Sequence, residues 1–172
     1  MNQLKWSALA VLLTIVSGCG YGLVGRTSNL PEDVRSVFVE TLENQTTRAQ
    51  IDQILTQAII QEFVTRQRFE VVPDRTSSDA VLSGSLTSFR VRPVTFDSDG
   101  RAEEYEISIT ARMEFKRNGE DEVLWANPAY LFRESYELEL AELSFLDQED
   151  AAMAEVAEAF AETMVIDLLE GF

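Results

Sequence analysis

Apolar and polar side chains alternate most regularly between residues 105 and 115. The even positions of this segment are polar, and the odd positions carry the apolar set Tyr105, Ile107, Ile109, Ala111, Met113 and Phe115. Successive side chains of a strand point to opposite faces of its sheet. The segment therefore predicts a strand with one buried and one solvated face. Asn118-Gly119 follows it and predicts a tight hairpin turn.

Residues 80–92 predict a second long strand, in which the parity of the apolar positions changes between Leu86 and Phe89. One extra residue in a strand exchanges its two faces. We therefore expect a β-bulge or a strong twist near Thr87. The following segment contains Asp99-Gly100, a strong turn signal, so this strand and the one at 105–115 should form an antiparallel hairpin.

A third long strand is predicted over about residues 123–138. Its apolar side chains again share one parity, at Tyr130, Phe132, Tyr136 and Leu138. Proline cannot donate a hydrogen bond to a neighbouring strand, so Pro128 should lie at a bulge or on a sheet edge.

Two segments repeat their apolar side chains at helical spacing. Residues 48–66 carry the stripe Ile51, Leu55, Ile59 and Phe63. The second helix is predicted to begin at Asp147 and to stop near Gly171, and its stripe is Met153, Val156, Phe160, Met164 and Leu168. One apolar face on each element is typical of helices that pack against a core.

The order of elements predicts an α+β fold of two layers. A short strand is expected within residues 34–42 and another extended piece at 69–72, giving the order β-α-β-β-β-α. We expect two helices packed on one face of a mainly antiparallel sheet of about four strands. The sequence is interpreted as a single domain over residues 34–172, preceded by a tether at 19–33 that is rich in glycine and polar residues.

Residues 1–18 have the pattern of an export signal. Lys5 gives a positive start, residues 6–16 are apolar, and Ser17 and Gly18 are small. The apolar stretch is shorter than the roughly 20 residues that span a bilayer, so we expect a signal peptide that is removed rather than a permanent transmembrane helix.

Cys19, the one cysteine in the sequence, directly follows this predicted signal. Val16-Ser17-Gly18-Cys19 resembles the lipobox of bacterial lipoproteins. That resemblance implies cleavage before Cys19 and lipid attachment to it, with several acyl chains giving stable anchoring. In lipoproteins of bacteria with two membranes, an aspartate directly after the cysteine tends to mean retention in the inner membrane. The resemblance therefore implies that this chain, with Gly20 at that position, goes to the outer membrane. The alternative interpretation is an inert cysteine in an uncleaved signal, although an unpaired cysteine is unusual in an exported protein.

The amino-acid composition limits the kinds of functional site that the chain can form. The chain has 30 acidic and 14 basic residues, a net charge of -16, and no histidine. Such a surface argues against nucleic-acid binding, which requires clustered lysine and arginine. Without histidine or a second cysteine, the usual zinc, Cys-His and Ser-His-Asp sites are excluded. The acids around the 97–104 turn do not follow a calcium-loop pattern. We therefore predict no enzymatic activity, no catalytic residues, no metal site and no cofactor besides the lipid on Cys19.

Several short motifs in a fixed order resemble the LptE family of lipopolysaccharide-assembly lipoproteins. They are the lipobox followed by Cys19-Gly20-Tyr21-Gly22-Leu23, then Leu30-Pro31, the turn Phe96-Asp97-Ser98-Asp99-Gly100 followed by Ala102-Glu103-Glu104-Tyr105, and Phe132-Arg133. The resemblance implies two helices against a four-stranded sheet. It also implies a non-enzymatic plug of the outer-membrane β-barrel LptD, which assists barrel assembly and lipopolysaccharide transport. The location would be the periplasmic side of the outer membrane, with lipid anchoring.

Four arginines are candidates for contact with the phosphates of lipopolysaccharide, namely Arg90, Arg92, Arg101 and Arg112. Guanidinium groups bind phosphate bidentately. The alternative is that these side chains form cross-strand ion pairs with Glu104, Glu106 and Glu114. A different functional class also stays open, in which the lipoprotein faces the periplasm and binds and regulates a cell-envelope enzyme.

Overall fold

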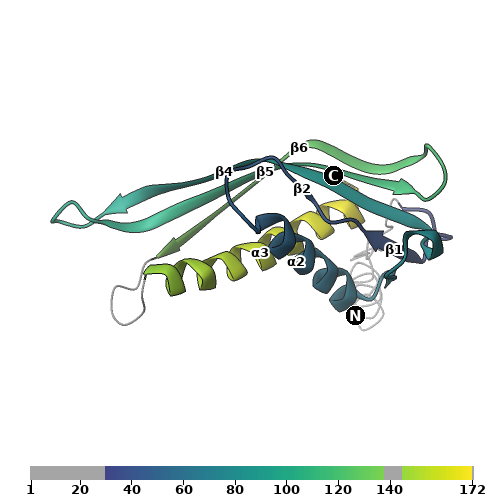
Figure 1. Ribbon diagram of the computed structural model, residues 1–172, viewed down its shortest axis with the longest axis horizontal. Coiled ribbons are helices and arrows are strands. Elements are labelled where there is room, and N and C mark those ends of the chain that lie inside the picture. The colour runs from purple at the N-terminus through teal and green to yellow at the C-terminus, as the bar shows by residue number, and fades with distance from the viewer. Residues whose placement is uncertain (1–29, 138–144, 172) are drawn as a thin grey trace, which may run out of the picture.

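The computed structural model describes residues 30–137 and 145–171 (Figure 1). The predicted signal peptide, Cys19 and residues 19–29 of the predicted tether lie outside the described residues. The elements are β1 (Ser36–Val39), β2 (Glu43–Asn44), α2 (Ile51–Arg66), β3 (Glu70–Val71), the short 3₁₀ helix η2 (Arg75–Ser77), β4 (Ala80–Phe96), β5 (Ala102–Arg117), β6 (Val123–Glu137) and α3 (Phe145–Glu170).

The sheet and the two α-helices form separate layers, with both helices on one face of the sheet (Figure 1). Among the described residues the sheet has six strands in the order β3-β1-β4-β5-β6, and β2 pairs additionally with β4. The predicted two-layer α+β class is confirmed, with more strands than the expected four. The first strand, predicted within residues 34–42, ends at Val39 as β1. The chain pairs with β4 a second time a few residues later, through β2.

Part of the sheet is parallel. β1 runs parallel to both β3 and β4, and β2 runs parallel to β4, whereas β4, β5 and β6 form the expected antiparallel meander. The chain leaves β1 through α2 and returns in β3, and such a helical crossover brings the second strand back in the same direction.

Both predicted irregularities of the long strands are confirmed. The β4–β5 register shifts between Leu86 and Ser88, which places the bulge at Thr87. In β6, Tyr130 pairs with Ala111 and Asn127 pairs with Met113, so β6 holds one extra residue beside Pro128. Proline lacks the N–H that a regular strand position would use for pairing, and the bulge accommodates this. β6 is also an edge strand of the sheet that the described residues form.

The core lies between the two layers, and both predicted helical stripes are buried in it. Phe160 of α3 packs edge-to-face on the rings of Tyr130 and Phe132 of β6, with ring centroids 5.5 and 5.7 Å apart. Helix α3 begins at Phe145, slightly earlier than predicted. No helix of the described chain combines the length and the apolar character that a membrane span requires.

One glycine permits a close approach inside the core. Gly84 of β4 faces the helices, where Met113 and Leu42 fill the space that a side chain would need. A Cβ atom at this position would lie 2.6 Å from the sulfur of Met113 and 2.7 Å from the carbonyl oxygen of Arg112. Any larger residue therefore forces β4 and β5 apart.

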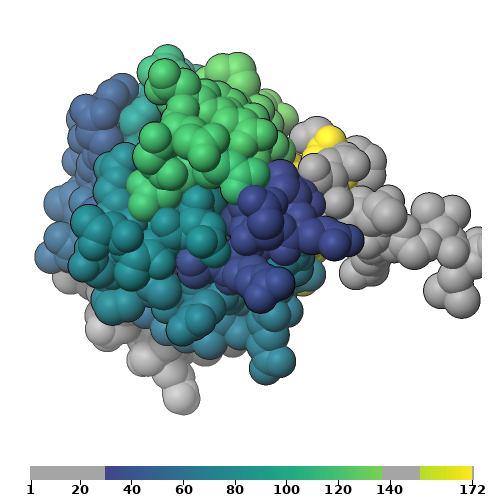
Figure 2. All heavy atoms as spheres, turned by 90° about the vertical axis from the view of Figure 1, so that its right-hand side faces the viewer, coloured from purple at the N-terminus to yellow at the C-terminus, as the bar shows by residue number. Residues whose placement is uncertain are grey.

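Polar contacts close the end of the molecule where β1 lies, which Figure 2 views directly. Arg117, at the end of β5, bonds to Asp33 at 2.7 Å and to Glu122 at 2.6 Å, and these carboxylates raise the pKa of the guanidinium. The carboxylate of Asp79 accepts hydrogen bonds from the backbone N–H groups of Arg35 and Ser36, each at 2.9 Å. These contacts join the start of β1 to β4 and to the β5–β6 turn.

Candidate functional site

The outer face of the sheet points away from the helices and carries two arginines, Arg90 and Arg133, side by side. We call this pair the arginine row. Ser108 of β5 pairs with Arg90 of β4 on one side and with Arg133 of β6 on the other. Adjacent strands lie about 4.8 Å apart, so the Cα atoms of the two arginines are about 10 Å apart across Ser108. Within the described chain, neither guanidinium has an acidic partner at ion-pair distance, and both side chains are exposed.

Two of the four predicted arginines already have acidic partners. The Nε atom of Arg92 bonds to Glu106 Oε1 at 3.0 Å and its Nη2 lies 2.8 Å from the same oxygen. Arg101 bonds to Asp99 at 2.7 Å inside the β4–β5 turn. For Arg92 this is the cross-strand ion pair that the alternative interpretation anticipated.

Arg112 lies apart from the other candidates. It faces the same side of the sheet but pairs with Ser85, several residues from Arg90. It lines a hollow of about 330 Å³ together with Glu40, Glu43 and Glu114. It makes no ion pair in the described chain, but the surrounding carboxylates lower the local potential and make the hollow less favourable to an anion than the row at Ser108.

Arg133 is the member of the row that the sequence analysis did not propose as a binding residue. The apolar residues Phe132 and Tyr136 have the opposite parity, so the sequence pattern predicts Arg133 on the polar face of its strand. Its alignment with Arg90 follows only from the pairing register of β6, which depends on the extra residue beside Pro128.

The two layers differ sharply in charge. Helix α3 contains no lysine or arginine over residues 145–170. Its residues Glu155, Glu158 and Glu162 are exposed on the side away from the sheet. The basic groups Arg90, Arg112 and Arg133 instead gather on the outer face of the sheet. A protein with a net charge of -16 thus retains a local surface that can attract an anion.

The acidic residues of the β4–β5 turn have structural partners. Asp97 Oδ1 accepts hydrogen bonds from the backbone N–H groups of Asp99 and Arg101, each at 2.8 Å. In residues 30–137 and 145–171, no group of three or more acidic, histidine or cysteine side chains is arranged to hold a metal ion. The hairpin projects beyond the helix layer (Figure 1), and Val94 and Phe96 near its tip are 40% and 56% exposed.

Residues 34–168 match the family model for LptE, lipopolysaccharide-assembly. The chain belongs to the LptE family. This confirms the resemblance drawn from the motifs, and it makes the protein an outer-membrane-associated lipoprotein of lipopolysaccharide assembly, in a family without enzymatic activity. A search of curated protein sequences found no significant match.

Solved structures share the fold at low sequence identity. Protein XCC0632 from Xanthomonas campestris aligns with a TM-score of 0.54 and 12% identity, over 83% of this chain and 88% of that chain. The hypothetical protein CT253 from Chlamydia trachomatis aligns with a TM-score of 0.53 and 9% identity, over 81% of this chain and 97% of that chain. At these identities the similarity extends to the fold alone.

Proposed function

We propose that this LptE-family protein is the lipid-anchored plug of an LptD-like outer-membrane β-barrel. In this role it assists assembly of the barrel and the passage of lipopolysaccharide to the cell surface. The observation that carries the proposal is the exposed pair Arg90 and Arg133 across Ser108, on a domain that is otherwise strongly acidic and belongs to the family.

The arginine row suits phosphorylated glycolipid. Each guanidinium can donate two parallel hydrogen bonds to a phosphate oxygen pair, and no carboxylate of residues 30–137 or 145–171 has to be displaced first. The small side chain of Ser108 leaves the space between the two arginines open. Arg112 would add a weaker contact further along the same face, whereas Arg92 and Arg101 would have to exchange Glu106 and Asp99 for the lipid.

Anchoring through Cys19 would hold the domain at the periplasmic side of the outer membrane. The segment between Cys19 and Leu30 reaches at most about 40 Å when fully extended, which keeps the domain near the membrane and near a barrel in it. Labelling with radioactive palmitate tests this step: the protein should incorporate label, and the C19S variant should not.

The partner is tested by isolating the lipidated protein, through a C-terminal tag, from detergent extracts of its own membranes. An integral β-barrel in roughly equal amount is the expected result. Isolation of a periplasmic or inner-membrane enzyme in its place would contradict the plug function and favour the regulatory alternative. The C19S variant serves as the control for association that depends on anchoring.

A further inference from the structure

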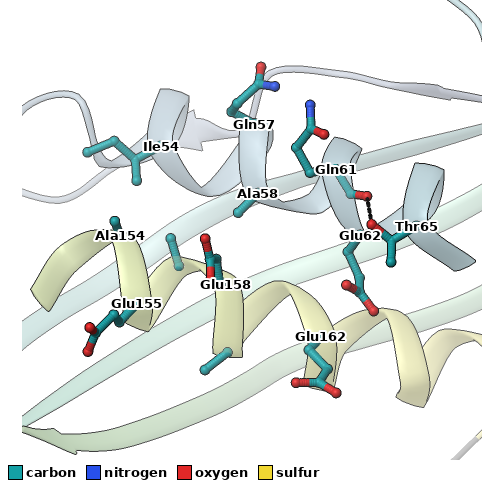
Figure 3. A pocket seen from close by; sticks show the side chains of 12 residues that line it. Ile54, Gln57, Ala58, Gln61, Glu62, Thr65, Ala154, Glu155, Glu158 and Glu162 are labelled. Atoms are coloured by element: carbon teal, nitrogen blue, oxygen red, sulfur yellow. Dashed lines mark hydrogen bonds between the residues drawn. The ribbon is translucent and has the colours of Figure 1, made fainter. Parts of the chain in front are cut away.

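The outward side of the helix layer contains a groove between α2 and α3 (Figure 3). Its volume is about 650 Å³. The alanines Ala58, Ala154, Ala157 and Ala159 line it, and their short side chains leave the space between the helices open. The groove is therefore wide enough for a polypeptide segment, and its alanine lining is apolar.

Carboxylates occupy both walls of the groove. Glu155, Glu158 and Glu162 follow one another along α3, and Glu62 points from α2 toward α3 (Figure 3). No lysine or arginine of the described residues lies within ion-pair distance of Glu155 or Glu158. The remaining polar lining groups include the uncharged Gln57 and Gln61. An anionic lipid is thus repelled from this groove, and a cation is attracted to it.

One end of the groove already holds a guanidinium. Arg66 of α2 bonds through Nε to Glu62, and its Nη2 lies 3.7 Å from Glu162 Oε1 of α3. A cation from the protein itself therefore bridges carboxylates of the two helices. Glu155 and Glu158 present the same type of group further along the groove, and no lysine or arginine of the described chain bridges them.

We propose that this groove is the docking surface for a cationic segment of the barrel partner, an inference that rests on the plug function proposed above. The segment carries lysine or arginine side chains that meet Glu155 and Glu158, and small or apolar side chains that pack on the alanines. Docking through the helix layer leaves the arginine row on the opposite face of the molecule open to lipopolysaccharide.

The test compares two charge-reversed variants of the full lipidated chain. E155K/E158K alters the groove, and E70K/D121K makes the same change of charge at exposed positions outside it. The amount of barrel isolated with E155K/E158K should fall about tenfold, because attraction becomes repulsion at a partly desolvated contact. E70K/D121K should retain the wild-type amount. All four side chains are exposed, and matching thermal unfolding midpoints will establish that both variants fold.

A photocrosslinking amino acid identifies the occupant directly. At Gln57, in the groove wall, it should form a crosslink to the barrel in clearly higher yield than at Val64, which is exposed on the same helix but outside the groove. Equal barrel yields from both charge variants, or crosslinks from Gln57 to lipopolysaccharide alone, overturn the docking proposal while the plug function stands. Absence of a barrel from the wild-type isolate overturns the plug function itself, and the docking proposal with it.

Discussion

Arg90 and Arg133 lie in one row across the outer face of the sheet, on either side of Ser108, although they are far apart in the sequence. The helix layer on the other side of the molecule carries carboxylates along α3. In the proposed function, this separation of charge would let a strongly acidic protein meet a phosphorylated glycolipid, because Arg90 and Arg133, which have no acidic partner within the described chain, lie on the face opposite those carboxylates.

The arginine row leads to a prediction about lipid binding. The R90A/R133A variant, purified with its lipid anchor in detergent, should bind lipopolysaccharide at least about tenfold more weakly, since charged hydrogen bonds contribute about 1.5–3 kcal/mol each. Fluorescence titration with labelled lipopolysaccharide measures the change. R101A/R92A removes the same charge from side chains that are already paired, and it should weaken binding less. An equal loss in both variants would argue against the row as the binding site.

Thr56 leads to a prediction about stability. Its hydroxyl accepts a hydrogen bond from the backbone N–H of Leu42 at 3.0 Å and donates to the carbonyl of Asp52 at 2.6 Å. T56V keeps the shape but leaves the buried N–H of Leu42 without a partner, so the free energy of unfolding should fall by about 1–3 kcal/mol.

The matched control for this change is T65V on the same helix. Thr65 donates to the carbonyl of Gln61 at an exposed position, and no buried group depends on it. Its free energy of unfolding should stay within about 0.5 kcal/mol of wild type. Denaturation by urea measures both variants, and equal losses would mean that the bond to Leu42 contributes little.

Any side chain at position 84 should lower the stability of the fold. G84A places a Cβ against the backbone carbonyl of Arg112, so β4 and β5 must separate locally, at a cost of about 1–3 kcal/mol in the free energy of unfolding. S83A, at the neighbouring outward-facing position, should change it by less than about 0.5 kcal/mol. A G84A variant as stable as the wild type would contradict the close approach seen in the core.

Asp79 gives the fold a dependence on pH. Hydrogen bonds from the backbone of Arg35, and from the hydroxyl and backbone of Ser36, hold the pKa of its carboxyl below the ordinary value of 3.8. A lowered folded-state pKa stabilises the fold fully above the unfolded-state pKa, and the contribution is lost as the pH falls through the folded-state value.

The D79N variant should therefore be less stable than wild type at pH 7, by about 1 kcal/mol given the exposure of this carboxylate. The difference should shrink as the pH falls below about 4. Thermal unfolding at pH 7 and pH 3 measures it. A difference that is as large at pH 3 as at pH 7 would show that the carboxylate charge is not the cause.

The long elements of the fold could be predicted because each repeats its pattern many times. The alternation over 105–115, the bulge at Thr87 and the irregularity at Pro128 were all readable from side-chain parity and from the chemistry of proline. The parallel part of the sheet was not, because β2 and β3 are only two residues long and show no periodicity.

The candidate site was predictable only in part for a related reason. Individual arginines could be assigned to the polar face, but the alignment of Arg90 with Arg133 requires the register of three strands at once. The groove between α2 and α3 was not foreseen either, because it depends on how close the two helices approach where Ala58 meets α3. A single apolar stripe identifies the buried face of a helix but not its lateral neighbour.

As a plug, this protein would support the assembly of an LptD-like barrel and, through the barrel, lipopolysaccharide at the cell surface. Depletion of the protein from its own cells, followed by parallel measurement of folded barrel and of surface-accessible lipopolysaccharide, tests it most directly. Both quantities should fall together, and expression of the wild-type protein should restore both. Normal amounts of folded barrel and of surface lipopolysaccharide after complete depletion would contradict it.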